Sequence, residues 1–211
     1  MAEKPKYLRA FFNSGPTGQI RRRALQDILD HIHRTVRPAL RAYLAAEQVL
    51  TAAQVAGDEA ASDVARGEVM RAARTAATEL HHLTDYALHH PPPAFADIAA
   101  VRAAVQSHVL FLREPKAPIP DDVALLRDTA EAFKHFKLDR ASATVADADA
   151  VATISTGYGV ALWGEGKWGG TEQCMVRRKD GDVRAMTSVL QNVFDAWMTL
   201  LGQPLAPIGE Y

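Results

Sequence analysis

The sequence is poor in cysteine and lacks both a long apolar run and a complete cofactor motif. Its 211 residues include a single cysteine, Cys174, which excludes an intrachain disulfide and a four-cysteine zinc site. No apolar run reaches the length of a membrane-spanning helix, and the N-terminal segment MAEKPKYLRAFF lacks the hydrophobic region of a signal peptide. These absences predict a cytoplasmic protein that does not bind membranes.

The glycine-rich stretch 157–170 fails two common motifs for nucleotide phosphates. A P-loop would need glycine in place of Ala161 and Ser or Thr in place of Trp168. A dinucleotide-binding G-x-G-x-x-G would need glycine in place of Leu162. We therefore expect no cofactor. Two interpretations remain open. One is a hairpin whose aromatic residues cover the helical body. The other is a surface for single-stranded nucleic acid, formed by Tyr158, Trp163, Lys167 and Trp168.

Charge is nearly balanced over the whole chain but unevenly distributed along it. Residues 1–46 carry nine Lys or Arg against three Asp or Glu, whereas residues 47–211 carry fifteen against twenty-two. This asymmetry is typical of an anion-binding face, although a basic helix packed on acidic neighbours produces it too. The basic run Arg21, Arg22 and Arg23 supplies candidate phosphate contacts in the first segment.

Hydrophobic spacings of three and four residues predict four helices separated by glycine and proline. We expect an N-terminal arm over 1–18 and then helices over 19–54, 58–89, 95–113 and 120–138. The first helix should kink or break near Arg37 because Pro38 has no N–H to donate. Gly57-Asp58 should end the first helix and cap the second. Asp121 and Asp122 are suited to capping the fourth helix. Short connections favour antiparallel packing, which predicts a helical bundle over 19–140.

The pattern changes near Ala150, where segments typical of strands begin. We expect strands over 151–155, 173–178 and 182–186, with a turn at Asp180-Gly181, and a last helix over 188–201 that Ser188 and Gln191 would cap. No base adjoins Cys174, so it should be a small buried hydrophobe. The expected fold is mainly α: an antiparallel bundle of about four helices, with a small β-hairpin element and a final helix over 141–211 packed on it.

Three polar residues fall on one face near the end of the second predicted helix. His82, Asp85 and His89 stand at positions i, i+3 and i+7, so they could present two imidazoles and a carboxylate to a metal ion. His135 of another helix could be a further ligand. In the alternative interpretation, Asp85 orients a histidine and the histidines at the helix end are solvated or stabilised by the helix dipole.

A second polar group lies in the fourth predicted helix. Arg127, Glu131, Lys134 and His135 fall on neighbouring turns. Together they could hold a phosphate and supply a group for proton transfer. In the alternative interpretation, Arg127 and Glu131 form an ordinary helical ion pair and a buried His135 is hydrogen-bonded across the bundle.

The segment Arg127-Asp128 followed by His135 resembles the active-site motif of the HEPN superfamily, whose members are often helical ribonucleases or nucleotide-transfer toxins. Seven residues separate Arg127 from His135, which is a wider spacing than in that motif. The resemblance covers at most residues 19–138. It implies an RNA-acting protein of a toxin or defence type, in which Arg127 and His135 are catalytic and two copies form a dimer. The phosphate contacts would come from Arg21, Arg22, Arg23 and Lys134.

Residues 80–201 are also similar to a family of uncharacterised bacterial proteins. The similarity lies in the Arg-Asp…Lys-His-Phe segment, the Gly/aromatic stretch 156–170 and the final Trp-containing helix. It implies an architecture and no activity. The alternative function is therefore a non-enzymatic helical interaction or structural module of bacterial or phage origin. Such a module would bind a partner, or a second copy as a homo-oligomer, through its Ala-rich helices and its Trp-bearing hairpin.

Overall fold

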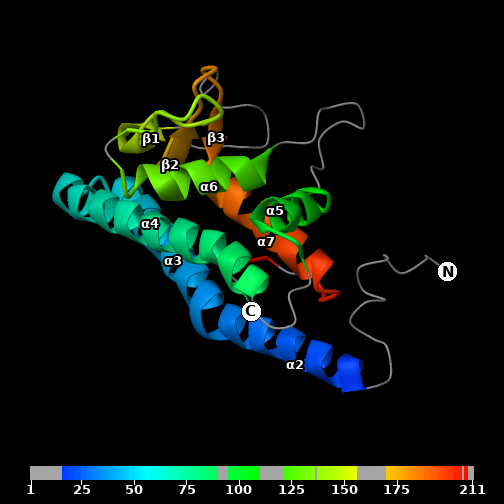
Figure 1. Ribbon diagram of the computed structural model, residues 1–211. Coiled ribbons are helices and arrows are strands. Elements are labelled where there is room, and N and C mark those ends of the chain that lie inside the picture. Colours follow the sequence, from blue (N-terminus) through cyan, green and yellow to red (C-terminus); the bar gives the residue numbers. More distant parts are fainter. Residues whose placement is uncertain are drawn as a thin grey trace, which may run out of the picture.

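The computed structural model describes residues 16–89, 95–109, 121–135, 137–155, 170–205 and 207–208, except for the side chains of 16–22 and 24. It is mainly helical with one small sheet near the C-terminus, which confirms the predicted fold class (Figure 1). In this part of the chain, no helix is both long and apolar enough to cross a membrane. The elements are α2 (Pro16–His31), α3 (Arg37–Val55), α4 (Glu59–His89), α5 (Ile98–Gln106), α6 (Asp122–Ala132), β1 (Val151–Ser155), β2 (Glu172–Arg177), β3 (Val183–Ala185) and α7 (Met186–Leu200).

A π-helical segment joins α2 to α3 where the sequence predicts a kink. It spans Ile32–Val36, and the N–H of Arg37 bonds the carbonyl of Ile32 instead of a carbonyl one residue nearer. Pro38 follows directly and cannot donate a hydrogen bond of its own. The predicted kink is therefore a wider turn within one continuous helical run.

Helices α3 and α4 form an antiparallel hairpin against which most of the other elements pack. Gly57 ends α3 with a φ of 69°, and the N–H groups of Gly57 and Asp58 bond the carbonyls of Gln54 and Ala53. This pattern closes the last turn of a helix with a left-handed residue, which glycine adopts without strain. The Asp58 carboxylate then accepts a bond from the N–H of Ala61 at 2.9 Å and caps α4. Both roles of Gly57-Asp58 are as predicted.

Two helices are shorter than their predicted ranges. α5 begins after Asp97, whose carboxylate caps it through the N–H of Ala100 at 2.7 Å, and it ends at Gln106 instead of Arg113. Residues 110–120 lie outside the described part of the chain. α6 ends at Ala132 instead of Leu138, for a reason that the candidate site supplies.

The sheet is an antiparallel meander in the order β1-β2-β3. Thr153 of β1 is opposite Cys174, and Val176 of β2 is opposite Arg184. Gly181 turns the chain between β2 and β3 with a φ of 96°, at the predicted Asp180-Gly181 turn. The glycine- and tryptophan-rich stretch 156–169 between β1 and β2, with its candidate residues, lies outside the described residues.

Helix α7 packs against both the sheet and the other helices (Figure 1). It contacts α4, α5, α6, β2 and β3, and its Trp197 and Phe194 are buried. It begins at Met186, so the predicted cap by Ser188 and Gln191 is wrong; Gln191 instead donates to Asp195 at 2.8 Å. Because α7 contacts both the helices and the sheet, the bundle and the sheet share one continuous core.

A buried carboxylate links α3 to the sheet and to α7. Glu47 is 2% exposed, and its Oε1 accepts bonds from the Tyr43 hydroxyl at 2.6 Å and from the N–H of Cys174 at 2.9 Å. Thr187 of α7 lies 3.2 Å from the same hydroxyl. Burial raises the pKa of Tyr43 and of the Cys174 thiol, so both groups keep their protons at neutral pH. Cys174 is therefore a buried, protonated residue, as predicted.

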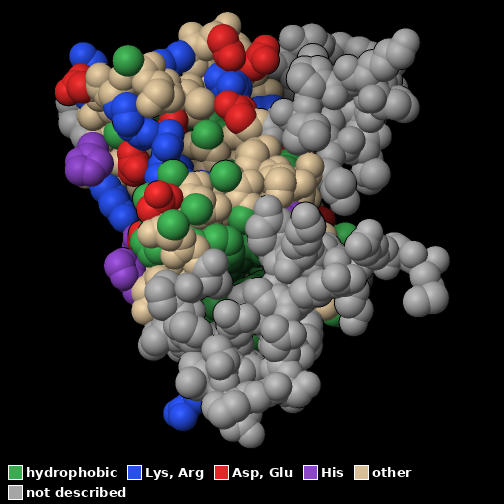
Figure 2. All heavy atoms as spheres, turned by 45° about the vertical axis from the view of Figure 1, so that its right-hand side comes forward, with side chains coloured by type: hydrophobic (Ala, Val, Ile, Leu, Met, Phe, Trp, Pro, Cys, Tyr) green, Lys and Arg blue, Asp and Glu red, His purple; other side chains and the backbone are tan. Residues whose placement is uncertain are grey.

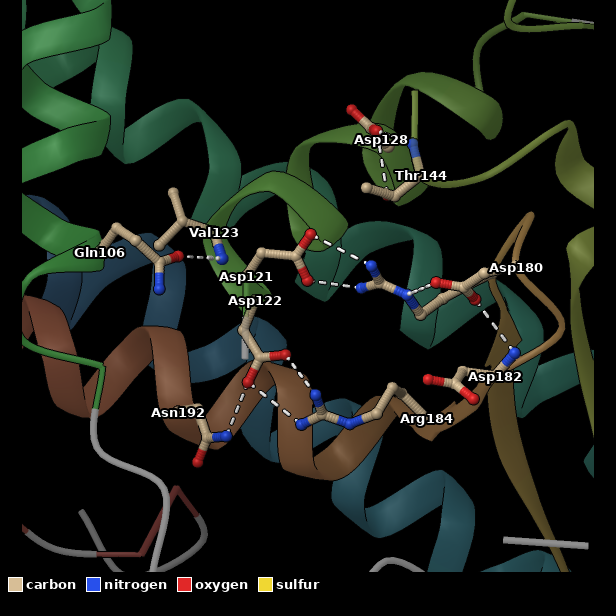
Figure 3. A network of polar contacts seen from close by, with 11 residues as sticks. Gln106, Asp121, Asp122, Val123, Asp128, Thr144, Asp180, Asp182, Arg184 and Asn192 are labelled. Atoms are coloured by element: carbon tan, nitrogen blue, oxygen red, sulfur yellow. Dashed lines mark hydrogen bonds and ion pairs between the residues drawn. The ribbon is translucent and has the colours of Figure 1, made fainter. Parts of the chain in front are cut away.

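The aspartates at the start of α6 bind arginines instead of capping the helix. Asp122 is completely buried, and its Oδ1 forms an ion pair with Arg184 at 2.9 Å. Its Oδ2 accepts hydrogen bonds from Arg184 at 3.1 Å and from Asn192 of α7 at 2.7 Å (Figure 3). Asp121 makes no side-chain cap and pairs with Arg178 beside the β2–β3 turn. The predicted capping role is wrong because ion pairs to the hairpin occupy both carboxylates. These ion pairs therefore hold the β2–β3 hairpin against the start of α6.

We predict that replacing Asp122 with Asn lowers the free energy of unfolding by about 3–5 kcal/mol, because it leaves the buried Arg184 charge without its counter-ion. Urea denaturation followed by circular dichroism measures the change. Asp182→Asn is the matched control: Asp182 is an exposed carboxylate of the same hairpin, and its loss should change stability by less than about 0.5 kcal/mol. Equal losses in both variants would contradict a buried ion pair.

Candidate anion-binding site

Four parts of the chain bring charged side chains together along α6. The residues are His81, His82 and Asp85 of α4, Arg102 of α5, Arg127, Asp128 and Glu131 of α6, and Lys134 and Arg140 of the segment that follows α6. We call Arg102, Arg127 and Arg140 the arginine cluster. On the face drawn in Figure 2, the described basic side chains stand among acidic ones and do not form an uninterrupted basic band.

The carboxylate of Asp128 fixes two of the three arginines. Its Oδ1 accepts bonds from Nε of Arg127 at 2.7 Å and from Nη2 of Arg140 at 2.9 Å. Its Oδ2 accepts bonds from the N–H and the hydroxyl of Thr144, at 2.5 and 3.0 Å. Asp128 is completely buried; burial alone would raise its pKa, but these hydrogen bonds outweigh burial and lower it. It is therefore an ionised, fully engaged carboxylate.

The same contacts explain why α6 stops at Ala132. The N–H of Leu138 bonds the carbonyl of Ala146 at 2.8 Å, which closes a loop over residues 138–146. Arg140 and Thr144 lie in this loop, and both bond Asp128. A helix that continued to Leu138 would carry this loop away from Asp128. The predicted end of the helix is wrong because a contact with a later part of the chain determines where it stops.

Arg102 completes the arginine cluster from α5. Its Nε is buried, and no hydrogen-bond partner for it exists among the described residues. Burial, followed by the positive charge of Arg127, lowers the pKa of Arg102, while Glu131 and Asp85 act in the opposite direction. A partly buried guanidinium with an unused donor beside a second guanidinium is in a position that an anion would stabilise.

Two histidines of α4 border the cluster and differ in environment. His81 is buried, and this burial, together with the nearby charge of Arg102, lowers its pKa to about 4. Its imidazole is therefore neutral at pH 7 and adds no charge. Nε2 of His82 lies 3.0 Å from Nζ of the exposed Lys134. Because an ammonium group has no acceptor, Lys134 donates this bond and the imidazole accepts it.

The predicted metal ligands are not brought together. His82 contacts the cationic Lys134, His89 is exposed at the end of α4, and His135 is exposed beyond the end of α6. The negative charge of Asp85 acts to raise the pKa of Arg102. Within the described ranges, no group of three or more His, Cys, Asp or Glu residues is arranged to hold a metal ion.

The predicted catalytic residues belong to different structural elements. Arg127 lies within α6 and its Nε is engaged by Asp128, whereas His135 is exposed in the turn that ends the helix. The N–H of His135 bonds the carbonyl of Glu131 at 3.0 Å. The alternative prediction of a buried His135 is wrong, and the Glu131 carboxylate pairs with Arg140 at 2.6 Å. His135 is thus available to solvent.

Of the predicted phosphate-binding residues, only Lys134 lies beside the arginine cluster. Arg23 is exposed on α2, and Figure 1 shows α2 well apart from α6. The side chains of Arg21 and Arg22 lie outside the described part of the chain. The basic run of α2 is therefore not part of the arginine cluster.

Sequence reasoning missed Arg102, Arg140 and the central role of Asp128. One local signal points to Arg102, which is the single charged residue of the mostly apolar helix IAAVRAAVQ. A charge inside a short apolar helix is unusual unless it meets a partner or a ligand. No comparable signal marks Arg140, because its importance arises from a contact with Asp128 across a loop.

Comparisons with known proteins leave the family of this chain open. No protein-family model matches the sequence, and no curated protein or solved structure matches it either. The functional argument therefore rests on the residues of the site.

We predict that Asp128→Asn destabilises the protein by about 3–5 kcal/mol at pH 7, because two arginines lose their buried counter-ion. The lowered pKa of Asp128 gives the sign of the pH dependence. Its stabilising effect is present above about pH 4, where the unfolded carboxyl group is also ionised, and is lost as the pH falls further. The difference between wild type and variant in urea denaturation should therefore shrink from pH 7 to pH 3.

The matched control for this measurement is Asp139→Asn. The Asp139 side chain is 82% exposed and pairs with Lys137 on the surface, so its loss should have little effect at either pH. A stability difference for Asp128→Asn that stays constant down to pH 3 would contradict an ionised carboxylate with a lowered pKa.

Proposed function

We propose that the protein binds RNA through phosphate contacts at the arginine cluster. The observation that carries this proposal is the buried Nε of Arg102, which has no hydrogen-bond partner among the described residues although Arg127 and Arg140 lie nearby. Buried donors are normally satisfied, and an unsatisfied one beside like charges is costly. A phosphate oxygen would accept a bond from this nitrogen and offset the repulsion between the guanidinium groups.

Phosphate suits this site better than a carboxylate ligand does. Guanidinium groups bind carboxylate and phosphate alike through pairs of parallel hydrogen bonds, but a phosphate offers more acceptor oxygens to the three arginines that α5, α6 and the loop after α6 supply here. Lys134 stands at the edge of the cluster and could turn from His82 toward a ligand. The resemblance to the HEPN superfamily supports RNA as the molecule that carries the phosphate.

We predict that Arg102→Gln weakens the binding of a short single-stranded RNA about tenfold, since a hydrogen bond to a charged group contributes about 1.5–3 kcal/mol. The slope of log affinity against log salt should also fall by about 0.7, the value for one phosphate contact on a single strand. Fluorescence anisotropy over a salt series measures both. Arg34→Gln is the control, because Arg34 is 80% exposed and belongs to the π-helical segment between α2 and α3. Identical curves for both variants would contradict the proposal.

The same labelled RNA tests whether binding leads to cleavage. If Arg127 and His135 act as an active pair, wild type degrades the RNA during incubation and His135→Ala does not. Exposure of His135 makes this a clean substitution with little effect on folding. Intact RNA with wild type, or equal degradation by wild type and variant, would leave binding without this catalytic pair.

A second candidate function, an interaction module, is favoured by a different surface. Val49, Val55 and Val64 of the α3–α4 hairpin are 59, 76 and 69% exposed. Figure 1 shows the closed end of this hairpin extending past the neighbouring helices. Exposed apolar side chains at a projecting end are suited to contact with a second copy of the chain.

We predict that the protein self-associates through this hairpin and that the double variant Val55→Ser/Val64→Ser is shifted toward monomer. Size-exclusion chromatography with light scattering over a range of concentrations measures the mass. Leu205→Ser is the control, because Leu205 is also exposed, at 51%, but lies after α7. A strictly monomeric wild type at high concentration would rule out this second candidate.

A further inference from the structure

The arginine cluster is compact. Arg127 and Arg140 bond the same oxygen of Asp128, so both guanidinium groups are held within hydrogen-bond distance of a single atom. Asp128 is itself immobilised by Thr144 through its other oxygen. Two of the three arginines are therefore fixed before any ligand arrives, which lowers the entropic cost of binding.

The third arginine, Arg102, lies close enough to the other two for their charges to act on it. Arg102 comes from α5, and the charges of Arg127 and Arg140 both act on its guanidinium group. Its Nε is buried without a partner in the described structure. Around these groups, four cations (the arginine cluster and Lys134) face three carboxylates (Asp85, Asp128 and Glu131), which leaves one positive charge in excess.

This geometry is suited to one phosphate group and not to a row of them. An RNA backbone that follows a protein surface needs basic side chains spread along its path. In contrast, the cations here converge on one carboxylate, and the described basic residues in Figure 2 are interrupted by acidic ones. A terminal phosphate monoester carries about −1.5 to −2 charges and three acceptor oxygens, so it can engage several guanidinium groups at once. An internal diester has less charge and fewer free oxygens.

We propose that the arginine cluster is a binding site for a terminal phosphate monoester of RNA. This inference rests on the proposed function and narrows it, since it names the end of the RNA as the group that is recognised. The fixed pair Arg127 and Arg140 holds the phosphate, and Arg102 completes its coordination with the donor that is otherwise unused. Internal phosphates contribute only sequence-independent attraction.

The test compares three forms of one short oligoribonucleotide: with a 5′-phosphate, with a 3′-phosphate, and with hydroxyl groups at both ends. We expect wild type to bind one phosphorylated form at least about tenfold more tightly than the hydroxyl-ended form. The preferred form identifies which end is recognised. Millimolar inorganic phosphate should compete with this form and have little effect on the hydroxyl-ended RNA.

Variants identify the residues responsible. Arg102→Gln should abolish the preference for a phosphorylated end, so that all three RNAs bind this variant with similar, weakened affinity. Arg102→Lys keeps the charge and loses the paired donors, so it should lose most of the preference too. Arg34→Gln should retain the full preference, since Arg34 lies on the exposed π-helical segment.

The outcomes separate this inference from the proposed function. Equal, salt-dependent binding of all three RNAs by wild type would overturn terminal recognition and leave RNA binding in place. Failure to bind any of them would overturn both. Because the wild-type comparison alone decides between these results, the test does not depend on the folding of a variant. A preference that survives in Arg102→Gln would place the terminal phosphate elsewhere and would also overturn the inference.

Discussion

The hydrogen bonds to the buried carboxylate of Asp128 determine the arrangement of the candidate site. An ionised carboxylate with no access to solvent is strongly unfavourable unless charged and polar groups surround it. Arg127, Arg140 and Thr144 supply those groups, and two of them come from a loop that the chain must form by leaving α6 at Ala132. The end of the helix, the closure of the loop and the position of two arginines thus follow from one buried charge.

A second buried carboxylate at the other end of α6 has a similar effect. Asp122 bonds Arg184 of β3 and Asn192 of α7, so the start of the helix is tied to the sheet while its later turns are tied to the following loop. Helix α6 is short, but it connects the N-terminal helices to the C-terminal third of the chain. The shared core around α7 supplies the apolar part of this connection, and the two aspartates determine its orientation.

Local chemistry made much of the fold predictable from the sequence. The cap at Gly57-Asp58, the strand Val151–Ser155 and the turn at Asp180-Gly181 depend on residues that are close along the chain, and the structure contains each of them. The errors share a different origin. Asp121, Asp122 and Asp128 have ordinary local roles in a helix, yet each binds a side chain far away in the sequence. Spacing along one helix holds no information about such partners.

In the candidate site too, residues close together along the chain were predictable, and residues brought in from other elements were not. Arg127 and Lys134 were identified because they lie on neighbouring turns of one segment. Arg102 and Arg140 become part of the site only after α5 and the loop at 138–146 pack against α6. The predicted metal ligands on α4 satisfied a helical spacing, but the structure gives His82 a lysine neighbour. A metal site needs ligands from several elements, and a pattern on one helix cannot establish that.

The π-helical segment before Pro38 has a consequence for how the first helical run can be used. Ile28, Ile32, Val36 and Leu40 are four residues apart, and all are buried. In a regular α-helix each step of four would move the side chain by about 40° around the axis, so such a stripe would gradually turn away from the core. The wider turn at Ile32–Val36 takes up this drift. A single uninterrupted helical run can therefore keep one apolar edge against the bundle at both of its ends, with no loop needed to realign it.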